Sequence, residues 1–302
     1  MRPFAALALV ITFAGPAPAA ELADRILPLV KAHRGRVAVA VKHLMTGIEF
    51  YHQADEPMPT ASLIKFPVMV EAYYQAADKK IDLATVLTLK KEHRVPGSGV
   101  LSHHFSDGAT FPLRDAVRLM IAVSDNTATN LVLEQTGIRP VNERMAKLGL
   151  TETRINAQVF RGSTTSVDPD RTKKYGLGST TARDMVKLLE LLHENKLVSE
   201  EACKEMIAHL RACDNDTMFK RFLPATVLLA HKTGAVTGAR TEAAIMTLPS
   251  GPVALCVLTD DNADRRWSVD NAAQLLLANV AKAVHDHFTP PAAPAAKDGG
   301  RP

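Results

Sequence analysis

Apolar and polar residues alternate near both ends of the chain, whereas in its middle the apolar positions recur every three to four residues. Alternation is typical of strands with one buried face, and the longer period is typical of amphipathic helices. Residues 36–44 alternate, and Thr46-Gly47 can turn the chain into a second strand over 48–51, which predicts a β-hairpin. Three more strand-like runs lie at 227–232, 240–248 and 253–260.

Helical periodicity predicts eight further elements, at 22–34, 62–77, 113–123, 124–134, 139–148, 180–193, 199–210 and 269–285. Thr110 resembles an N-cap, with Pro112 just inside the helix that follows. Residues 156–178 have no clear period, and a loop of this length in a compact domain usually has a function.

The distribution of these elements predicts the fold class. Strands come from both chain ends and helices from the middle, so we expect an α+β protein. Its antiparallel sheet would be built from both ends and flanked by helices, with an inserted all-helical lobe. The groove between sheet and lobe is where we expect the active site.

The two chain ends differ in composition from the rest. Residues 1–19 combine an early positive charge, a short apolar run and the small residues of Ala17-Pro18-Ala19, which predicts a secretory signal cleaved after Ala19. The run is too short to span a bilayer, so we expect a periplasmic or secreted protein without a membrane span. Residues 20–288 would form one domain, and the Pro/Ala/Gly-rich 289–302 a disordered tail.

Composition excludes several classes of protein. The formal charge of +4 comes from scattered basic residues, so nucleic acid is not an expected partner. Cys203, Cys213 and Cys256 match no zinc spacing, and we expect neither metal nor cofactor. Cys256 lies in an apolar run and is expected to be buried, while Cys203 and Cys213 could pair in an oxidising compartment. We expect a monomer that acts on a small molecule.

Candidate chemistry begins at Ser62, which is followed by Lys65 at the start of an apolar helical run. This spacing puts both side chains on one helix face, where a desolvated lysine can take the serine proton. A helix start also directs backbone N–H groups at an oxyanion formed beside Ser62. The alternative is an N-capping serine followed by an exposed lysine.

Two further motifs, Ser124-Asp125-Asn126 and Lys232-Thr233-Gly234, follow in order at a helix junction and a strand end. The three together are the set known from class A β-lactamases and penicillin-binding proteins. The stretch 110–130 and Gly97-Ser98-Gly99 resemble the same family. The chain therefore resembles a class A serine β-lactamase.

The resemblance implies a catalytic role for each motif residue. Ser62 would attack the lactam carbonyl, and the N–H groups of Ser62 and Ala235 would form the oxyanion hole. Lys65 is the implied base for acylation. Ser124 would pass a proton to the leaving nitrogen, and Lys232 would tune Ser124 electrostatically.

The resemblance also implies substrate-binding residues. Asn126 would hold the lysine base and the substrate amide, while Lys232, Thr233 and Gly234, with Ala235, would receive the substrate carboxylate end. Arg240 is a further candidate for the carboxylate, and its alternative is an exposed strand arginine. Asp125 is expected to bond nearby backbone rather than act in catalysis.

The resemblance breaks in the long loop. Class A enzymes carry there a glutamate that activates the deacylating water, and an ungapped count puts Val159 at that position. The loop arginine falls on Ala157, and an expected aspartate falls on Gly178. Asp168 and Asp170 are candidates to supply the carboxylate from this loop, and the alternative is that both form turns beside Pro169.

Three functions remain open from the sequence. The first is a β-lactamase that hydrolyses the cyclic amide through an acyl-enzyme on Ser62, with slow or atypical deacylation. The second is a D,D-peptidase-like enzyme, acting on a peptidoglycan-like substrate, or another serine hydrolase of the same fold. The third is a β-lactam-binding module that stays acylated. The missing glutamate favours the second and third, and a free exported domain favours the first.

Overall fold

The computed structural model describes residues 18–289 and confirms the predicted α+β class. A five-stranded antiparallel sheet has the order β2-β1-β10-β9-β8. The hairpin β1 (Arg36–His43) and β2 (Glu49–His52) pairs with the C-terminal β10 (Gly251–Asp260), β9 (Ala239–Leu248) and β8 (Leu228–Val236). Strands from the two chain ends therefore meet in one sheet, and β8 forms its edge.

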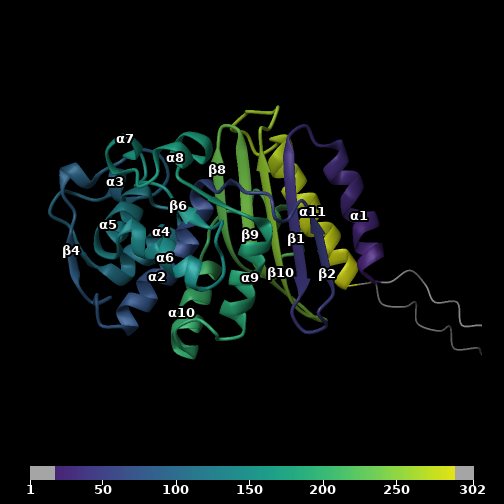
Figure 1. Cartoon of the computed structure of the whole chain (residues 1–302), viewed down its shortest axis with the longest axis horizontal. Coiled ribbons are helices and arrows are strands. Elements are labelled where there is room, and N and C mark those ends of the chain that lie inside the picture. Colours follow the sequence, from purple (N-terminus) through teal and green to yellow (C-terminus); the bar gives the residue numbers. More distant parts are fainter. Residues whose placement is uncertain (1–17, 290–302) are drawn as a thin grey trace, which may run out of the picture.

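Helices cover both faces of the sheet (Figure 1). The terminal helices α1 (Pro18–Ala32) and α11 (Ala272–Phe288) lie together on one face, and α9 (Ala182–His193) packs on the other, beside the helical lobe. The alternation in β1 follows from this arrangement. Val37, Val39 and Val41 join the core under α1 and α11, whereas Ala38 and Ala40 join the core shared with the lobe.

The remaining elements form the lobe and its connections. The helices are α2 (Lys65–Ala77), α3 (Leu101–His104), α4 (Leu113–Ala122), α5 (Asn126–Thr136), α6 (Ile138–Lys147), α7 (Gly162–Thr165), α8 (Pro169–Tyr175) and α10 (Glu200–Arg211). The 3-10 helices are η1 (Ala61–Ile64), η2 (Lys91–His93) and η3 (Phe219–Phe222). The short strands are β3 (Met58–Pro59), β4 (Val86–Thr88), β5 (Thr110–Pro112), β6 (Arg154–Ile155) and β7 (Gly178–Thr180).

The start of α4 corrects one sequence prediction. Thr110 is not an N-cap but lies in β5, which pairs with β4. The first N–H groups of α4 are satisfied instead by backbone: Leu113 donates to the Thr85 carbonyl at 2.8 Å, and Arg114 to that of Leu83 at 2.9 Å. A capping side chain is unnecessary because these tertiary partners bond the orphan donors.

Two other predictions about local structure need correction. Ser62 does not open an α-helix, because it lies in the 3-10 turn η1, and α2 begins only at Lys65. The segment 156–178 is not structureless either, since it contains α7 and α8 and reaches β7. Most of the predicted signal segment and tail, 1–17 and 290–302, lie outside the described residues.

The cysteines are free in this structure, and all three are buried within the described part of the chain. The disulfide considered between Cys203 and Cys213 is therefore absent. Across residues 18–289, no helix combines the length and apolarity needed to cross a bilayer.

Strand β8 packs closely against the turn that carries the candidate nucleophile. A Cβ added to Gly234 would lie 2.4 Å from the Thr60 carbonyl oxygen and 2.8 Å from the Leu63 nitrogen. Both atoms belong to backbone, which cannot rotate away. Glycine at this position therefore permits the close approach of β8 to η1.

We expect Gly234→Ala to destabilise the fold by about 1–3 kcal/mol, because the added methyl overpacks a backbone contact. Chemical denaturation would measure the loss. Gly238→Ala is the matched control, since a Cβ there meets nothing within 4 Å. Equal stability of the two variants would contradict this account of the β8–η1 contact.

Candidate active site

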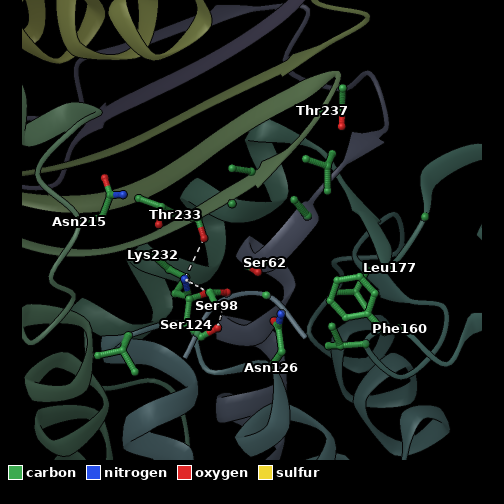
Figure 2. Close-up of a pocket in the computed structure, with 18 of the residues that line it drawn as sticks. Ser62, Ser98, Ser124, Asn126, Phe160, Leu177, Asn215, Lys232, Thr233 and Thr237 are labelled. Carbon is green, nitrogen blue, oxygen red and sulfur yellow. Dashed lines mark hydrogen bonds between the residues drawn. The ribbon is translucent and has the colours of Figure 1, made fainter. Parts of the chain in front are cut away.

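A cavity of about 820 Å³ opens between the edge strand β8 and the helical lobe. It brings together all three motifs, which are far apart in the sequence. Figure 2 shows Ser62, Ser124, Asn126, Lys232 and Thr233 converging on it. The groove expected between sheet and lobe is therefore present.

Lys65 lies behind Ser62 at the floor of this site and is completely buried. Its Nζ donates to the Ser124 carbonyl at 2.7 Å, to the Asn126 Oδ1 at 2.8 Å and to the Ser124 hydroxyl at 3.2 Å. The alternative of an exposed lysine is thus wrong. Most residues of helix α2 are buried, so the Lys65 side chain projects into the core. The hydrogen bonds with Ser124 and Asn126 satisfy its polar head there.

Lys65 and Lys232 both contact Ser124. Its hydroxyl accepts from Lys65 Nζ and, at 3.1 Å, from Lys232 Nζ. The residue has a positive φ of 54°, in the left-handed region that serine seldom occupies. The Ser124 carbonyl accepts hydrogen bonds from Lys65 Nζ and, at 2.9 Å, from the Ser98 hydroxyl. These bonds offset the energetic cost of the left-handed backbone. The dashed lines in Figure 2 follow the Lys232 contacts.

Burial sets the protonation preference of both lysines. It lowers the pKa of Lys65 well below its ordinary value, and the nearby charge of Lys232 lowers it further. Burial also lowers the pKa of Lys232, against the opposing negative groups of Cys213, Glu242 and Asp214. Two ammonium groups sharing one hydroxyl repel each other, so the site favours a neutral amine on Lys65.

Asp125 organises the backbone around the motif, as expected. Its carboxylate accepts from the Ala128 N–H at 2.8 Å, capping α5, and from Val100 at 2.6 Å and Leu101 at 2.8 Å. Gly99 packs so tightly on it that a Cβ would lie 2.3 Å from the carboxyl carbon. Asp125 thereby joins the 97–101 loop to the start of α5.

The β8 residues named from the sequence divide into two groups. Thr233, Gly234 and Ala235 line the cavity together with Lys232. Arg240 is 1% exposed and does not line the cavity, so the alternative of an exposed strand arginine is wrong. Its guanidinium donates to the carbonyls of Val236, Ala239 and Arg266 and lies 4.6 Å from the centroid of the Trp267 ring.

The long loop presents apolar side chains to the cavity where the family pattern has charges. Val159 and Ala157 both line it. Val159 is fixed by Asn130, whose Oδ1 accepts from the Val159 N–H at 2.8 Å and whose Nδ2 donates to its carbonyl at 3.0 Å. This buried pair holds the loop against α5, and an ion pair between Arg161 of the loop and Glu134 of α5, at 3.7 Å, adds a second contact.

Neither aspartate from the loop reaches the site. Asp168 caps α8 by accepting from the Arg171 N–H at 3.0 Å, and Asp170 is exposed on the same helix. Neither aspartate forms the turn considered from the sequence, because Asp168 is the N-cap of α8 and Asp170 lies in its first helical turn. Among the cavity-lining residues of 18–289, Asp214 alone carries a carboxylate.

Sequence reasoning missed several residues of the cavity wall. Asp214 and Asn215 come from the segment after α10, and Phe160 is 66% exposed at its rim. No motif singled these three out, whereas Trp267, which is 68% exposed and also lines the cavity, lies in a stretch whose sequence resembles the family. Phe160 has a positive φ of 56°, a feature visible only in the folded chain. No grouping of His, Cys, Asp and Glu suited to a metal occurs within residues 18–289.

Known proteins share this arrangement. A model of the Beta-lactamase enzyme family matches residues 21–288. A β-lactamase of Streptomyces cellulosae is 30% identical over 78% of this chain and 75% of its own. The solved class A β-lactamase of Bacteroides cellulosilyticus superposes with a TM-score of 0.79, at 23% identity over 91% of this chain and 99% of its own.

A second kind of relative has the same fold. The acyl-enzyme complex of a PBP-A mutant with penicillin G superposes with a TM-score of 0.76, at 21% identity over 89% of this chain and 96% of its own. At that identity the likeness concerns the fold alone. The family match spans the sheet, the lobe and all three motifs, and the cavity brings those motifs together; the chain therefore belongs to the Beta-lactamase enzyme family.

Proposed function

We propose that this protein is a serine hydrolase that opens β-lactams through an acyl-enzyme on Ser62 and deacylates slowly. The observation that carries the proposal is the fully buried Lys65, hydrogen-bonded to Ser124 and Asn126 beside a cavity-lining Ser62. A desolvated amine of this kind is a base strong enough to activate a serine and weak enough to be neutral.

Acylation follows from the positions of these groups. The neutral Lys65 amine takes the Ser62 proton as Oγ attacks the lactam carbonyl. The N–H groups of Ser62 and Ala235 would stabilise the oxyanion. Ser124 then delivers a proton to the departing ring nitrogen, and its hydroxyl contact with Lys232 favours that donation. The Lys65 ammonium returns the proton taken from Ser62 to Ser124 across their 3.2 Å contact, so both groups regain their starting forms. The cleaved amide remains as an ester on Ser62.

Substrate recognition would use the β8 side of the cavity. Lys232 and Thr233 present a cation and a hydroxyl to the carboxylate of a β-lactam, while Gly234 leaves room for it. Asn126 faces the same cavity and would bind the substrate amide. Arg240, the register partner of Ala235, would add a buried positive charge behind the strand without touching the ligand.

Deacylation is the step for which the site is poorly equipped. A water attacking the Ser62 ester needs a base, and the loop wall offers Val159 and Ala157. A general base typically contributes ~10²–10⁴-fold to such a step. The ester would therefore form faster than it is hydrolysed, and its hydrolysis would limit turnover.

A second function, a D,D-peptidase-like enzyme, is favoured by the same apolar loop wall. The similar PBP-A structure is that of a leucine-to-glutamate mutant held as its penicillin G acyl-enzyme. A long-lived ester suits transfer to an amine of peptidoglycan. Release of D-alanine from a D-alanyl-D-alanine peptide, faster than β-lactam hydrolysis, would identify this function; an ester that never turns over would identify a binding module.

The proposed location is outside the cytoplasm. We propose that residues 1–19 are a cleaved signal, as their sequence indicates. Cleavage after Ala19 would remove only the first two residues of α1, which starts at Pro18. N-terminal sequencing of protein exported from a bacterial host tests this location.

Replacing Ser62 by alanine should abolish covalent labelling by a fluorescent penicillin, because the ester oxygen is removed. Thermal stability should stay close to wild type, since the Ser62 side chain has no hydrogen bond among those found in residues 18–289. Intact-mass spectrometry measures the adduct. Ser163→Ala, at an exposed serine, is the control and should label normally. An adduct on another residue of the Ser62→Ala protein would refute the assignment.

The acylation rate should reach its plateau well below pH 10.4, the ordinary pKa of lysine. Lys65 must be neutral to accept the proton, and its pKa is lowered, so the amine is already populated at lower pH. The rate should fall as the pH drops through that lowered pKa. Stopped-flow measurement of the acylation phase provides the profile. A rate still rising near pH 10 would mean that Lys65 is not the base.

Turnover of a chromogenic cephalosporin should show a burst followed by a slower phase, because the ester accumulates. Val159→Glu should shorten the acyl-enzyme lifetime at least about tenfold by placing a base on the loop wall, a fraction of the full effect of general-base catalysis. Val159→Gln is the matched control and should not. Asp168→Asn and Asp170→Asn should leave the lifetime unchanged. Rapid single-phase hydrolysis by the wild type would overturn this expectation.

A further inference from the structure

Phe160 combines exposure to solvent with an unfavourable backbone conformation. Its side chain is 66% exposed and lines the active-site cavity, while its backbone has a positive φ of 56°. A bulky residue rarely adopts this left-handed conformation, and such outliers gather at ligand-binding sites, where surrounding contacts maintain them. The ring gains little from folding at this exposed position, which indicates a role in binding.

The neighbouring residues hold Phe160 in place. On one side, the Val159 backbone makes hydrogen bonds of 2.8 and 3.0 Å with the Asn130 amide. On the other side, the Arg161 guanidinium lies 3.7 Å from the Glu134 carboxylate of α5. Both partners belong to the same helix, so the backbone that carries the ring is fixed before a ligand enters. Little ordering would remain for the ligand to impose, which favours binding.

The Phe160 ring lies close to the proposed base. A Cβ added to Gly97 would be 3.3 Å from Phe160 Cε2 and 2.7 Å from Asn126 Nδ2, so the ring and this amide are neighbours of the same glycine. Asn126 in turn accepts a hydrogen bond from Lys65 Nζ at 2.8 Å. A substrate positioned for attack by Ser62 would therefore extend to the ring.

The position of the ring determines which half of a substrate it meets. Figure 2 shows Ser124 and Lys232 on one side of Ser62, and Phe160 with Leu177 on the other. The leaving nitrogen would point toward Ser124, which is its proposed proton donor. The second substituent of a trigonal carbonyl carbon points away from the leaving group. The acyl half of the substrate would therefore face the loop wall.

We propose that Phe160 is a specificity-determining residue that packs against a flat apolar group on the acyl half of the substrate. This inference rests on the proposed function and names its substrate class, β-lactams whose side chain ends in an aromatic ring. The cavity of about 820 Å³ is in the range of pockets that enclose whole drug-sized molecules. Aromatic rings in contact attract each other beyond the effect of buried area. The neighbouring wall is also apolar, with Ala157, Val159 and Leu177.

Equilibrium binding to the Ser62→Ala protein tests this inference without any reaction. The two ligands are benzylpenicillin and 6-acetamidopenicillanic acid, which differ only in the phenyl ring. Trp267, the sole tryptophan of the chain, lines the cavity, and its fluorescence reports binding. We expect benzylpenicillin to bind at least about fivefold more tightly.

Variants at two phenylalanines identify the residue responsible for this preference. Adding Phe160→Ala to the Ser62→Ala protein should remove most of the preference. Phe222→Ala is the matched control and should retain it, because Phe222 is 38% exposed and does not line the cavity. Equal affinities for the two penicillins, or a preference that survives Phe160→Ala, would overturn the proposal.

Thermal stability separates a binding role from a structural one. Phe160→Gly should lose the preference while its Tm stays the same or rises, because glycine adopts a positive φ without steric cost. Phe160→Tyr keeps a flat ring and should keep the preference. A lower Tm of Phe160→Gly with an unchanged preference would show that the ring is structural and would overturn the proposal.

The rate of acylation separates this inference from the function on which it rests. In the protein with Ser62 intact, benzylpenicillin should form the adduct at least about fivefold faster than the acetamido compound, as intact-mass spectrometry would measure. The absence of any adduct would refute the proposed function, and the binding comparison would still decide the role of Phe160. Adducts that form equally fast from both penicillins would refute this inference alone.

Discussion

The active site depends on one constraint: the Lys65 Nζ lies where water cannot reach it. A buried polar group is costly unless it is hydrogen-bonded, and here the Ser124 carbonyl and hydroxyl and the Asn126 amide oxygen are its partners. Those three acceptors require the left-handed backbone of Ser124 and the capping of α5 by Asp125. The strained junction and the tight loop packing thus serve to hold one amine in place. Desolvation lowers the pKa of that amine and so favours the neutral form that the proposed activation of Ser62 requires.

The same cavity has an asymmetric wall. On the β8 side, Lys232, Thr233 and the backbone of Ala235 provide the groups for binding and acylation. On the loop side, Val159 is fixed to Asn130 by two hydrogen bonds through its backbone, so its side chain faces the cavity without a charge. Under the proposed function, this asymmetry would let the ester on Ser62 form faster than it is hydrolysed.

Electrostatic coupling extends beyond the motif residues. Strand β8 carries Lys232 toward the cavity and His231 toward the face that holds Glu242. Glu242, which pairs with His231, therefore also acts on the neighbouring Lys232: together with Cys213 and Asp214, it opposes the lowering of the Lys232 pKa by burial.

The sequence alone determined the strands, the α+β class and the three motifs, since alternation, helical periodicity and short spacings are local properties. It also revealed the missing glutamate. Tertiary structure decided what depends on distant partners. Thr110 pairs as a strand rather than capping α4, because the carbonyls of Leu83 and Thr85 already accept from the first N–H groups of that helix. Arg240 is buried because backbone carbonyls and the Trp267 ring surround its guanidinium. It also brought Cys213, His231 and Glu242 together, because no sequence period links residues whose contact exists only after β8, β9 and the segment after α10 have packed.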